Sequence, residues 1–234
     1  MTREDLNKVL ENHKLWIHGK EGGQRANLSG ENLRGVNFSD ANLRCADLRD
    51  ADLKDANLKG ANLRCANLSN TDLRNADFTN ANLTDADLTD ADLRYANLNY
   101  ADLTDANLRC ADLINADLIN ADLTNANLRG ADIRNANLTD ANLNYADLKC
   151  ANLRNANLRG ANLDFSCLPL WCGSLSTHFD DKQLIQIAYH LVKAGLNSKN
   201  ASDETKEELS KLIDFANKFH RVNECGKILK GEQK

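Results

Sequence analysis

The sequence predicts an all-β solenoid with a helical segment at each end, and three observations support this. First, a large apolar residue occupies every fifth position from Leu28 to Leu163, which gives 28 tandem units, 25 of them with Leu at the centre. Second, each unit places a residue, usually Ala, and then Asn or Asp before the large residue, the in–out–in alternation of a short extended segment. Third, 20 of the 28 units end in Gly, Asn or Asp, which adopt left-handed backbone angles most readily.

A period of five residues fits neither a regular helix nor a regular strand. Successive leucines would lie about 140° apart on a helix, and a strand would send them to opposite faces. We therefore predict that each unit is a three-residue strand followed by a two-residue bend, so that the chain coils with Ala and Leu inside. Neighbouring coils would pair their backbones about 4.8 Å apart and stack equivalent side chains in ladders.

The units resemble the pentapeptide-repeat family, whose AxLxx pattern is carried from residue 26 onward by the stretch ANLSGENLRGVNFSDANLRCADL. The resemblance covers residues 26–168 and implies a right-handed quadrilateral β-helix with four units in each coil. With 28 units the rod would have about seven coils, and residues 20 positions apart would share a face.

The limits of the repeat divide the chain into residues 1–25, 26–168 and 169–234. We expect residues 1–25 to form an N-terminal capping helix and loop, because Thr2 and Asp5 have the spacing of a capping box. The cap is needed because an open coil would expose apolar side chains and unpaired strand edges.

We expect residues 169–234 to form a C-terminal helical cap or a dimerisation region. Apolar spacing predicts one helix from Asp180 to about Ala194 and a second from Ser202 to about Arg221. The apolar faces of these helices must be buried against the end of the rod, against each other or against a second copy of the chain. The last arrangement would give a homodimer.

Composition and charge restrict the location and the partners. The charged N-terminal stretch and the lack of a long apolar run predict a cytoplasmic protein without a membrane segment. Seven cysteines, an odd number, favour reduced thiols over a disulfide framework. The net charge of −5 provides no basic surface for direct nucleic-acid binding.

Two features of the predicted surface are candidates for protein binding. One is an apolar cluster at neighbouring corners, where most units have polar residues, formed by Tyr95, Tyr100, Ile114 and Ile119. The other is a column of Arg and Lys residues beside a column of Asp residues, interrupted at Ile114. We interpret these columns mainly as opposite charges that neutralise each other, because like charges stacked about 5 Å apart repel.

Acidic side chains on two further faces suggest a different partner. These carboxylates belong to Asp85, Asp102, Asp105 and Asp122 on one face and to Asp77, Asp117 and Asp140 on the next. An acidic rod can imitate the charge of duplex DNA. The family resemblance implies the same alternative, since some members bind DNA gyrase, a topoisomerase, and protect it from fluoroquinolones. Residues 26–168 contain 21 acidic and 14 basic residues, a much lower charge density than that of a duplex.

The C-terminal segment contains residue types that bind zinc, and the candidates are Cys167, Cys172, His220 and Cys225. Their spacing matches no C-x₂-C or H-x₃-H pattern, so we expect no metal and keep a metal-binding tail as a second alternative. Cys45 and Cys65 would lie one coil apart at one corner, within the backbone range of a disulfide, but their side chains should run parallel.

The sequence contains no motif for catalysis. It has no G-x-S-x-G, no glycine-rich phosphate loop and no H-E-x-x-H, and most of its carboxylates lie in repeated, solvent-facing ladders. We therefore expect a non-enzymatic, rod-shaped interaction or scaffold protein that needs no cofactor and binds a protein whose identity the sequence does not indicate.

Overall fold

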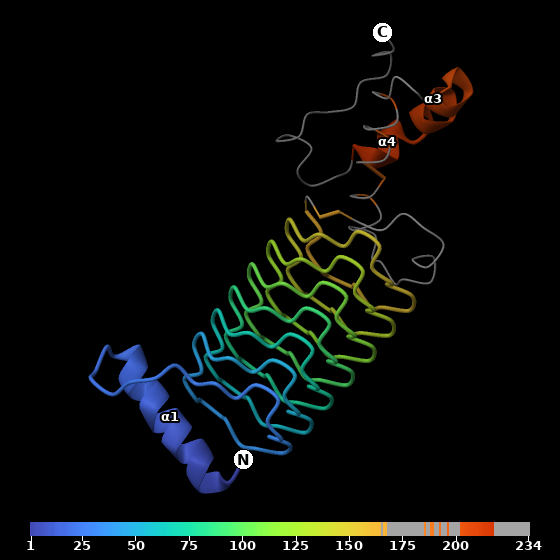
Figure 1. The fold of residues 1–234 in the computed structure, drawn as a ribbon. Helices are drawn as coiled ribbons and strands as arrows, with labels where there is room; N and C mark the ends of the chain where they lie inside the picture. Colours follow the sequence, from blue (N-terminus) through green and yellow to red (C-terminus); the bar gives the residue numbers. More distant parts are fainter. Residues whose placement is uncertain are drawn as a thin grey trace. The chain divides into compact units, whose positions relative to one another are not determined.

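A computed structural model of the chain describes residues 1–164, 166–167, 185, 188–189, 192, 196 and 202–217. Its main feature is a stack of β-coils, in which the Asn or Asp of each unit forms a parallel bridge with the residue 20 positions later. The ladders run from Asn27 to Cys167, from Asn32 to Asn152, from Asn37 to Asn157 and from Asn42 to Asn162. Four ladders offset by five residues make a β-helix with four units in each coil (Figure 1).

The backbone of each unit is bonded to the coils before and after it. The amide of Asn97 donates to the carbonyl of Ala76 at 2.9 Å, and the carbonyl of Asn97 accepts from the amide of Phe78 at 2.7 Å. A further bond joins the amide of Asn80 to the carbonyl of Asn99 at 3.1 Å. The extended segment is thus very short, because one residue in each unit forms the bridge and the next residues turn the corner.

The corners have the left-handed backbone that the sequence predicts. Every fifth residue from Gly30 to Gly160 has a positive φ, and these angles lie between 55° and 74°. Asp, Asn and Gly fill most of these positions, as expected for this region of backbone space. Tyr and Cys also occupy corners, for example Tyr95 with φ 61° and Cys65 with φ 56°.

The Asn or Asp before each Leu closes the same corner with its side chain. The Oδ1 atom accepts the amide of the residue two positions later, as in Asn57 and Lys59 at 3.1 Å or Asp122 and Thr124 at 3.0 Å. This bond recurs from Asn27 to Asn162 with one exception, Asp117. Asn and Asp both supply this oxygen, which explains why no other residue type occurs at this position.

The interior is a continuous column of Leu and Ala side chains. Almost all central residues are at most 2% exposed, and most Ala residues are at most 1% exposed. Thr71, which replaces one Ala, is also fully buried, and its hydroxyl donates to the carbonyl of Leu48 at 2.8 Å. Burial of each Leu contributes about 1.5–3 kcal/mol before conformational entropy is counted.

Helix α1 (Arg3–Ile17) lies against the first coil. Its N-terminus is closed by the expected capping box, in which the Asp5 amide donates to Thr2 Oγ1 at 3.1 Å. The hydrogen bonds from Thr2 hold the pKa of Asp5 below its usual value. At the other end of the helix, Nδ1 of the buried His13 accepts the amide of Ala26 at 3.0 Å, which ties α1 to the first unit.

Residues 179–234 form a second compact unit, separate from residues 1–178. Its described helices are α3 (Asp203–Ser210) and α4 (Ile213–Ala216), and Ile185, Ala188, Tyr189, Val192 and Leu196 are also helical. Helix α3 begins after the N-cap residue Ser202, as predicted. The predicted single helix is instead interrupted at Lys211 and Leu212, whose amides bond to carbonyls three residues back and so tighten the turn.

The apolar faces in this second unit pack against each other. Tyr189, Val192 and Ile213 form a buried cluster, and Ile185, Leu196 and Leu209 pack around it. The sequence leaves three arrangements open for the apolar faces of the C-terminal helices. The cluster corresponds to the one in which the two helical segments contact each other. Within the described part of the chain, none of the helices combines the length and apolar character needed to cross a bilayer.

The Leu column predicts a large effect of truncation. We expect Leu98→Ala to lower the free energy of unfolding by about 2–5 kcal/mol, because Leu98 is fully buried and the cavity would be closed in by neighbouring coils. Guanidinium chloride unfolding followed by circular dichroism measures this. The exposed Arg129→Ala variant is the control, expected within about 0.5 kcal/mol of the unmodified chain. Equal losses for both variants would contradict the prediction.

The side-chain bond at the corners predicts a difference between two substitutions of one residue. Asn57→Ala removes the acceptor for the Lys59 amide and should lower the free energy of unfolding by about 1 kcal/mol. Asn57→Asp keeps an oxygen at the same place and should cost less than half as much. The same unfolding measurement tests both variants, and an equal loss for Ala and Asp would show that the bond contributes nothing.

Candidate functional site

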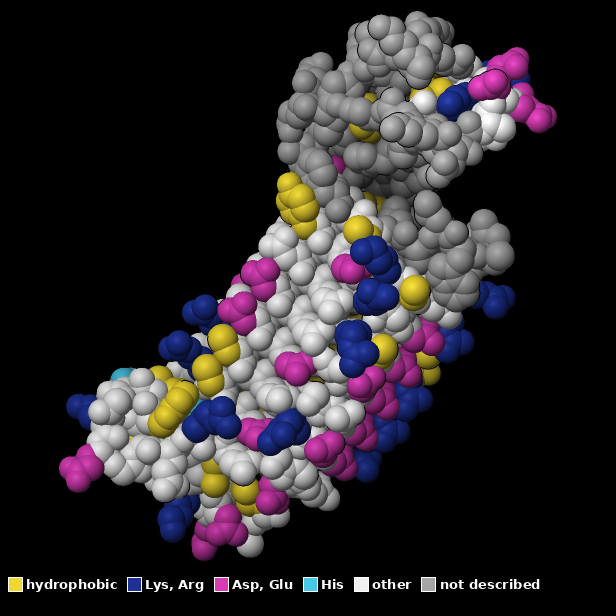
Figure 2. Space-filling view, turned by 45° about the horizontal axis from the view of Figure 1, so that its top comes forward, with side chains coloured by type: hydrophobic (Ala, Val, Ile, Leu, Met, Phe, Trp, Pro, Cys, Tyr) yellow, Lys and Arg dark blue, Asp and Glu magenta, His cyan; other side chains and the backbone are white. Residues whose placement is uncertain are grey.

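One face of the β-helix carries paired acidic and basic side chains. Arg74 Nε donates to Asp72 Oδ1 at 2.8 Å and Nη2 donates to Oδ2 of the same carboxylate, while Nε also lies 3.5 Å from Asp92 Oδ2 in the next coil. Arg94 repeats this arrangement with Asp92 and Asp112. The bonds from Arg74 hold the pKa of Asp72 low. Figure 2 shows acidic and basic side chains in adjacent rows along the coils, consistent with mutual neutralisation.

This pairing is interrupted at Ile114, which stands where the coils on either side have Arg94 and Arg134. Asp112 accepts the Ile114 amide at 3.1 Å and lies 3.5 Å from Arg94 Nε, but it has no guanidinium from its own unit. Burial therefore raises the pKa of Asp112, although the Ile114 amide and Arg94 oppose the shift. Asp112 therefore lacks the arginine partner that Asp72, Asp92 and Asp132 each have in their own unit.

The structure brings the predicted apolar cluster together at two neighbouring corners, and we name it the tyrosine–isoleucine patch: Tyr95, Tyr100, Ile114 and Ile119. The Tyr95 amide donates to the Ile114 carbonyl at 3.1 Å, and the Tyr100 amide donates to the Ile119 carbonyl at 3.0 Å. Tyr95 is 62% exposed and Tyr100 is 58% exposed, whereas both Ile residues are partly buried.

The corner pattern also changes at this patch. The Ile119 amide donates to Asn99 Oδ1 at 2.7 Å, across the coils, instead of to Asp117 Oδ1 in its own unit. Asp117 Oδ2 accepts from Asn99 Nδ2 at 3.1 Å, while Asp117 Oδ1 is buried without a hydrogen-bond partner. Ile114 therefore interrupts the row of arginines, and Ile119 interrupts the pattern of corner hydrogen bonds.

The predicted acidic faces consist of two kinds of carboxylate. Asp77, Asp102 and Asp122 accept corner amides, which Asn does equally well elsewhere, so their charge is not needed for the fold. Asp117 occupies the same position in its unit, the bridge-forming residue before the central Leu. The second kind, Asp85, Asp105 and Asp140, are corner residues with positive φ. Asp85 lies 3.3 Å from Arg64 Nη2.

Two of these carboxylates are direct neighbours, because Asp102 and Asp122 bridge adjacent coils. Burial alone would raise the pKa of Asp102, but hydrogen bonds from Thr104 and Thr84 outweigh it and the pKa is lowered. Asp102 therefore keeps its negative charge on this face at neutral pH.

Of the predicted zinc candidates, Cys167 is an exposed free thiol, whereas Cys172, His220 and Cys225 lie outside the described residues. No group of three or more His, Cys, Asp or Glu side chains is placed to hold a metal ion within the described residues. Cys45 and Cys65 are also free thiols, and burial together with the neighbouring Cys45 thiol raises the pKa of Cys65.

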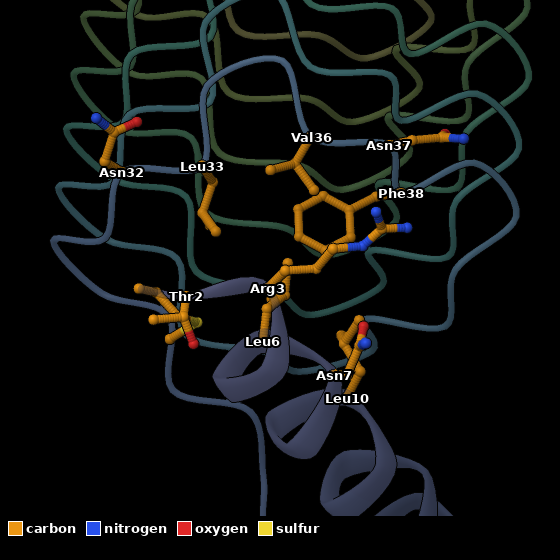
Figure 3. Close-up of a pocket in the computed structure, with 11 residues that line it drawn as sticks. Thr2, Arg3, Leu6, Asn7, Leu10, Asn32, Leu33, Val36, Asn37 and Phe38 are labelled. Atoms are coloured by element: carbon orange, nitrogen blue, oxygen red, sulfur yellow. The ribbon is translucent and has the colours of Figure 1, made fainter.

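A cavity of about 460 Å³ lies between α1 and the first coil, and the sequence alone does not predict it (Figure 3). It is lined from α1 and its N-terminal end by Met1, Thr2, Arg3, Leu6, Asn7 and Leu10, and from the coil by Asn32, Leu33, Val36, Asn37 and Phe38. The sequence feature that could have indicated this cavity is the irregular start of the repeat, where Glu31 and Val36 replace Ala.

Comparison with known proteins identifies the fold family. No curated protein sequence matches the chain. Among solved structures, the chain is 36% identical to HetL, a pentapeptide repeat protein involved in heterocyst differentiation regulation from the cyanobacterium Nostoc sp. strain PCC 7120, covering 65% of this chain and 73% of that one with a TM-score of 0.34. It is 34% identical to a pentapeptide repeat protein of the Arabidopsis thaliana thylakoid lumen, covering 48% and 68% of the two chains with a TM-score of 0.19.

A third solved structure, full-length QnrB1, a plasmid-mediated fluoroquinolone resistance protein, is 17% identical over 71% of this chain and 97% of that one, with a TM-score of 0.35. The family assignment rests on the repeat itself. The family model of pentapeptide repeats matches in eight copies that together span residues 24–169. Proteins of this family fold as right-handed quadrilateral β-helices, in agreement with the four ladders of this structure. The chain belongs to the pentapeptide repeat family.

Proposed function

We propose that this protein is a non-enzymatic scaffold that binds a protein partner through the tyrosine–isoleucine patch. The observation that carries the proposal is the exposure of Tyr95 and Tyr100, 62% and 58%, on a face where neighbouring coils have polar residues. Tyr is among the residue types that contribute most to binding at protein interfaces, and exposed apolar groups that cluster mark contact surfaces.

The rigid backbone beneath the patch supports this function. Tyr95 and Tyr100 are anchored through their amides to the next coil, and their corners have fixed positive φ angles. A partner would therefore meet side chains whose backbone needs no ordering, which lowers the entropic cost of binding. A partner with a basic group near its apolar surface would also neutralise the negative charge of Asp112, whose own unit has Ile114 in place of Arg.

Repetition argues for a scaffold rather than an enzyme. The same Asp, Asn, Arg and Thr side chains recur on each face and bond to their own corners. A catalytic centre needs a unique nucleophile, base or metal with a pKa tuned by its surroundings. The departures at Tyr95, Tyr100, Ile114 and Ile119 are aromatic or aliphatic side chains, which suits binding.

The proposal predicts that a patch variant loses its partner while keeping its fold. Tyr95→Asn, Tyr100→Asn, Ile114→Arg and Ile119→Thr introduce residues found at the equivalent positions of adjacent coils, so the combined variant should unfold at the same denaturant concentration. Affinity capture with quantitative mass spectrometry should show at least one protein reduced about tenfold or more, since two aromatic contacts are removed.

The control for this experiment is Tyr145→Asn, which removes another corner Tyr that is 55% exposed and has φ 59°. It should retain the protein that the patch variant loses. Identical sets of captured proteins for the unmodified chain and the patch variant would refute the patch as the binding surface.

A DNA-mimicking binder of DNA gyrase is the alternative function. The observation that favours it is that Asp102, Asp105 and Asp122 have no ion pair within the described residues and lie on adjacent rows. Such a face would present unneutralised negative charge to a DNA-binding groove.

The alternative predicts inhibition of gyrase supercoiling, or protection of gyrase from a fluoroquinolone, at stoichiometric amounts of the protein. Changing Asp102, Asp105 and Asp122 to Asn should abolish the effect, because three charges are lost while the corner oxygens of Asp102 and Asp122 remain. Changing Asp50, Asp52 and Asp87 to Asn on other faces, one corner and two ladder carboxylates without an ion pair within the described residues, is the matched control and should leave it intact. The absence of any effect at large excess would exclude gyrase as the partner.

A further inference from the structure

We propose that the cavity between α1 and the first coil binds a small amphiphilic molecule with an apolar chain and a single carboxylate, such as a medium-chain fatty acid. This inference is independent of the proposed partner surface, because the cavity involves the first coil and none of the patch residues. It depends on the shape of the cavity, the apolar character of its walls and one unpaired positive charge.

The cavity exists because a helix and not a further coil covers the first coil. Successive coils approach to about 4.8 Å, which leaves no space between their stacked side chains. A helix with its side chains is about 10–12 Å wide and cannot follow the square outline of a coil. The space that remains next to α1 is about 460 Å³, within the usual range of about 300–1,000 Å³ for small-molecule sites.

The walls of the cavity are mainly apolar. Leu6 and Leu10 come from α1, and Leu33, Val36 and Phe38 come from the first coil (Figure 3). Leu33 and Phe38 are 2% exposed, and Leu6 is 8% exposed, so these side chains are already shielded from bulk water. Leu10 and Val36 are partly exposed and would be covered further by a ligand with an apolar chain.

The charge around the cavity favours an anionic head group. Arg3 is the one charged side chain among the described residues that line it, and no carboxylate lines it. Arg3 forms no ion pair within the described residues, whereas the Met1 amine pairs with Glu31 at 3.0 Å and the Asp5 carboxylate accepts the Thr2 hydroxyl at 2.6 Å. In Figure 3, Arg3 reaches from α1 toward the coil beside Phe38.

A guanidinium at the edge of an apolar cavity binds a carboxylate with two parallel hydrogen bonds. The same charge repels a cationic amphiphile and gives a neutral alcohol no ion pair. Ligands that have apolar chains of equal length but different head groups therefore distinguish the proposed ligand class from the others.

The experiment uses dansylaminoundecanoic acid, whose fluorescence rises in an apolar site, with the full-length chain. We expect saturable 1:1 binding and displacement by octanoate at a concentration about tenfold lower than by octanol, the ratio expected for one charge-assisted pair. Octyltrimethylammonium should displace the probe less well than octanol does.

Variants from both walls test the location. Leu10→Trp on α1 and Val36→Phe on the coil narrow the cavity from opposite sides, and each should weaken probe binding while circular dichroism and the unfolding midpoint show a folded chain. Arg3→Gln should weaken displacement by octanoate about tenfold and leave octanol unchanged. Arg44→Gln, an exposed change in the first coil outside the cavity, is the control and should bind as the unmodified chain does.

Four results would overturn the proposal. The first is no saturable fluorescence change with the unmodified chain. The second is unchanged probe binding by folded Leu10→Trp and Val36→Phe variants. The third is an equal loss for octanoate and octanol in Arg3→Gln. The fourth is a doubled molar mass in light scattering that the probe reverses, because the cavity would then be a contact between two copies of the chain.

Discussion

The pairing of each unit with the unit 20 residues later is the interaction on which the rest of the structure depends. The Asn97 amide and carbonyl, for example, bond to the coil before at 2.9 and 2.7 Å, and the same bonds recur along all four ladders. This register places Leu above Leu and corner above corner, so the interior is a closed column. It also decides which outward side chains become neighbours, because residues 20 apart are adjacent on the surface.

Corner geometry and surface charge are connected through the Asn or Asp of each unit. Its Oδ1 holds the corner amide, as Asn57 does for Lys59, and either residue type satisfies this bond. Asp at the same position can add an ion pair, as Asp72 does with Arg74. The acidic composition of the coils thus follows partly from backbone requirements, and charge alone is weak support for DNA mimicry. The missing arginine at Ile114 and the exchanged amide partner at Ile119 carry more information about function.

The two proposed sites use different consequences of the same architecture. The tyrosine–isoleucine patch lies within the regular coils, where the backbone is held on both sides and exposed side chains are displayed without ordering cost. The cavity lies where regular stacking ends and a helix replaces a coil, so that Leu33, Val36 and Phe38 line a cavity on that side. One site depends on the repetition, and the other depends on its interruption.

The sequence by itself determined the repeat, the buried Leu and Ala column, the left-handed corners, the Thr2–Asp5 cap and the position of Tyr95 and Tyr100 on the surface. These features are local or repeated, so residue type and spacing are sufficient to predict them. Only the tertiary structure decided the cavity at α1, the exchange of amide partners at Ile119, the interruption between α3 and α4 and the packing of Tyr189 with Ile213. Each of these features depends on the distance between segments that are not equivalent repeat units, and a periodic sequence pattern does not predict that distance.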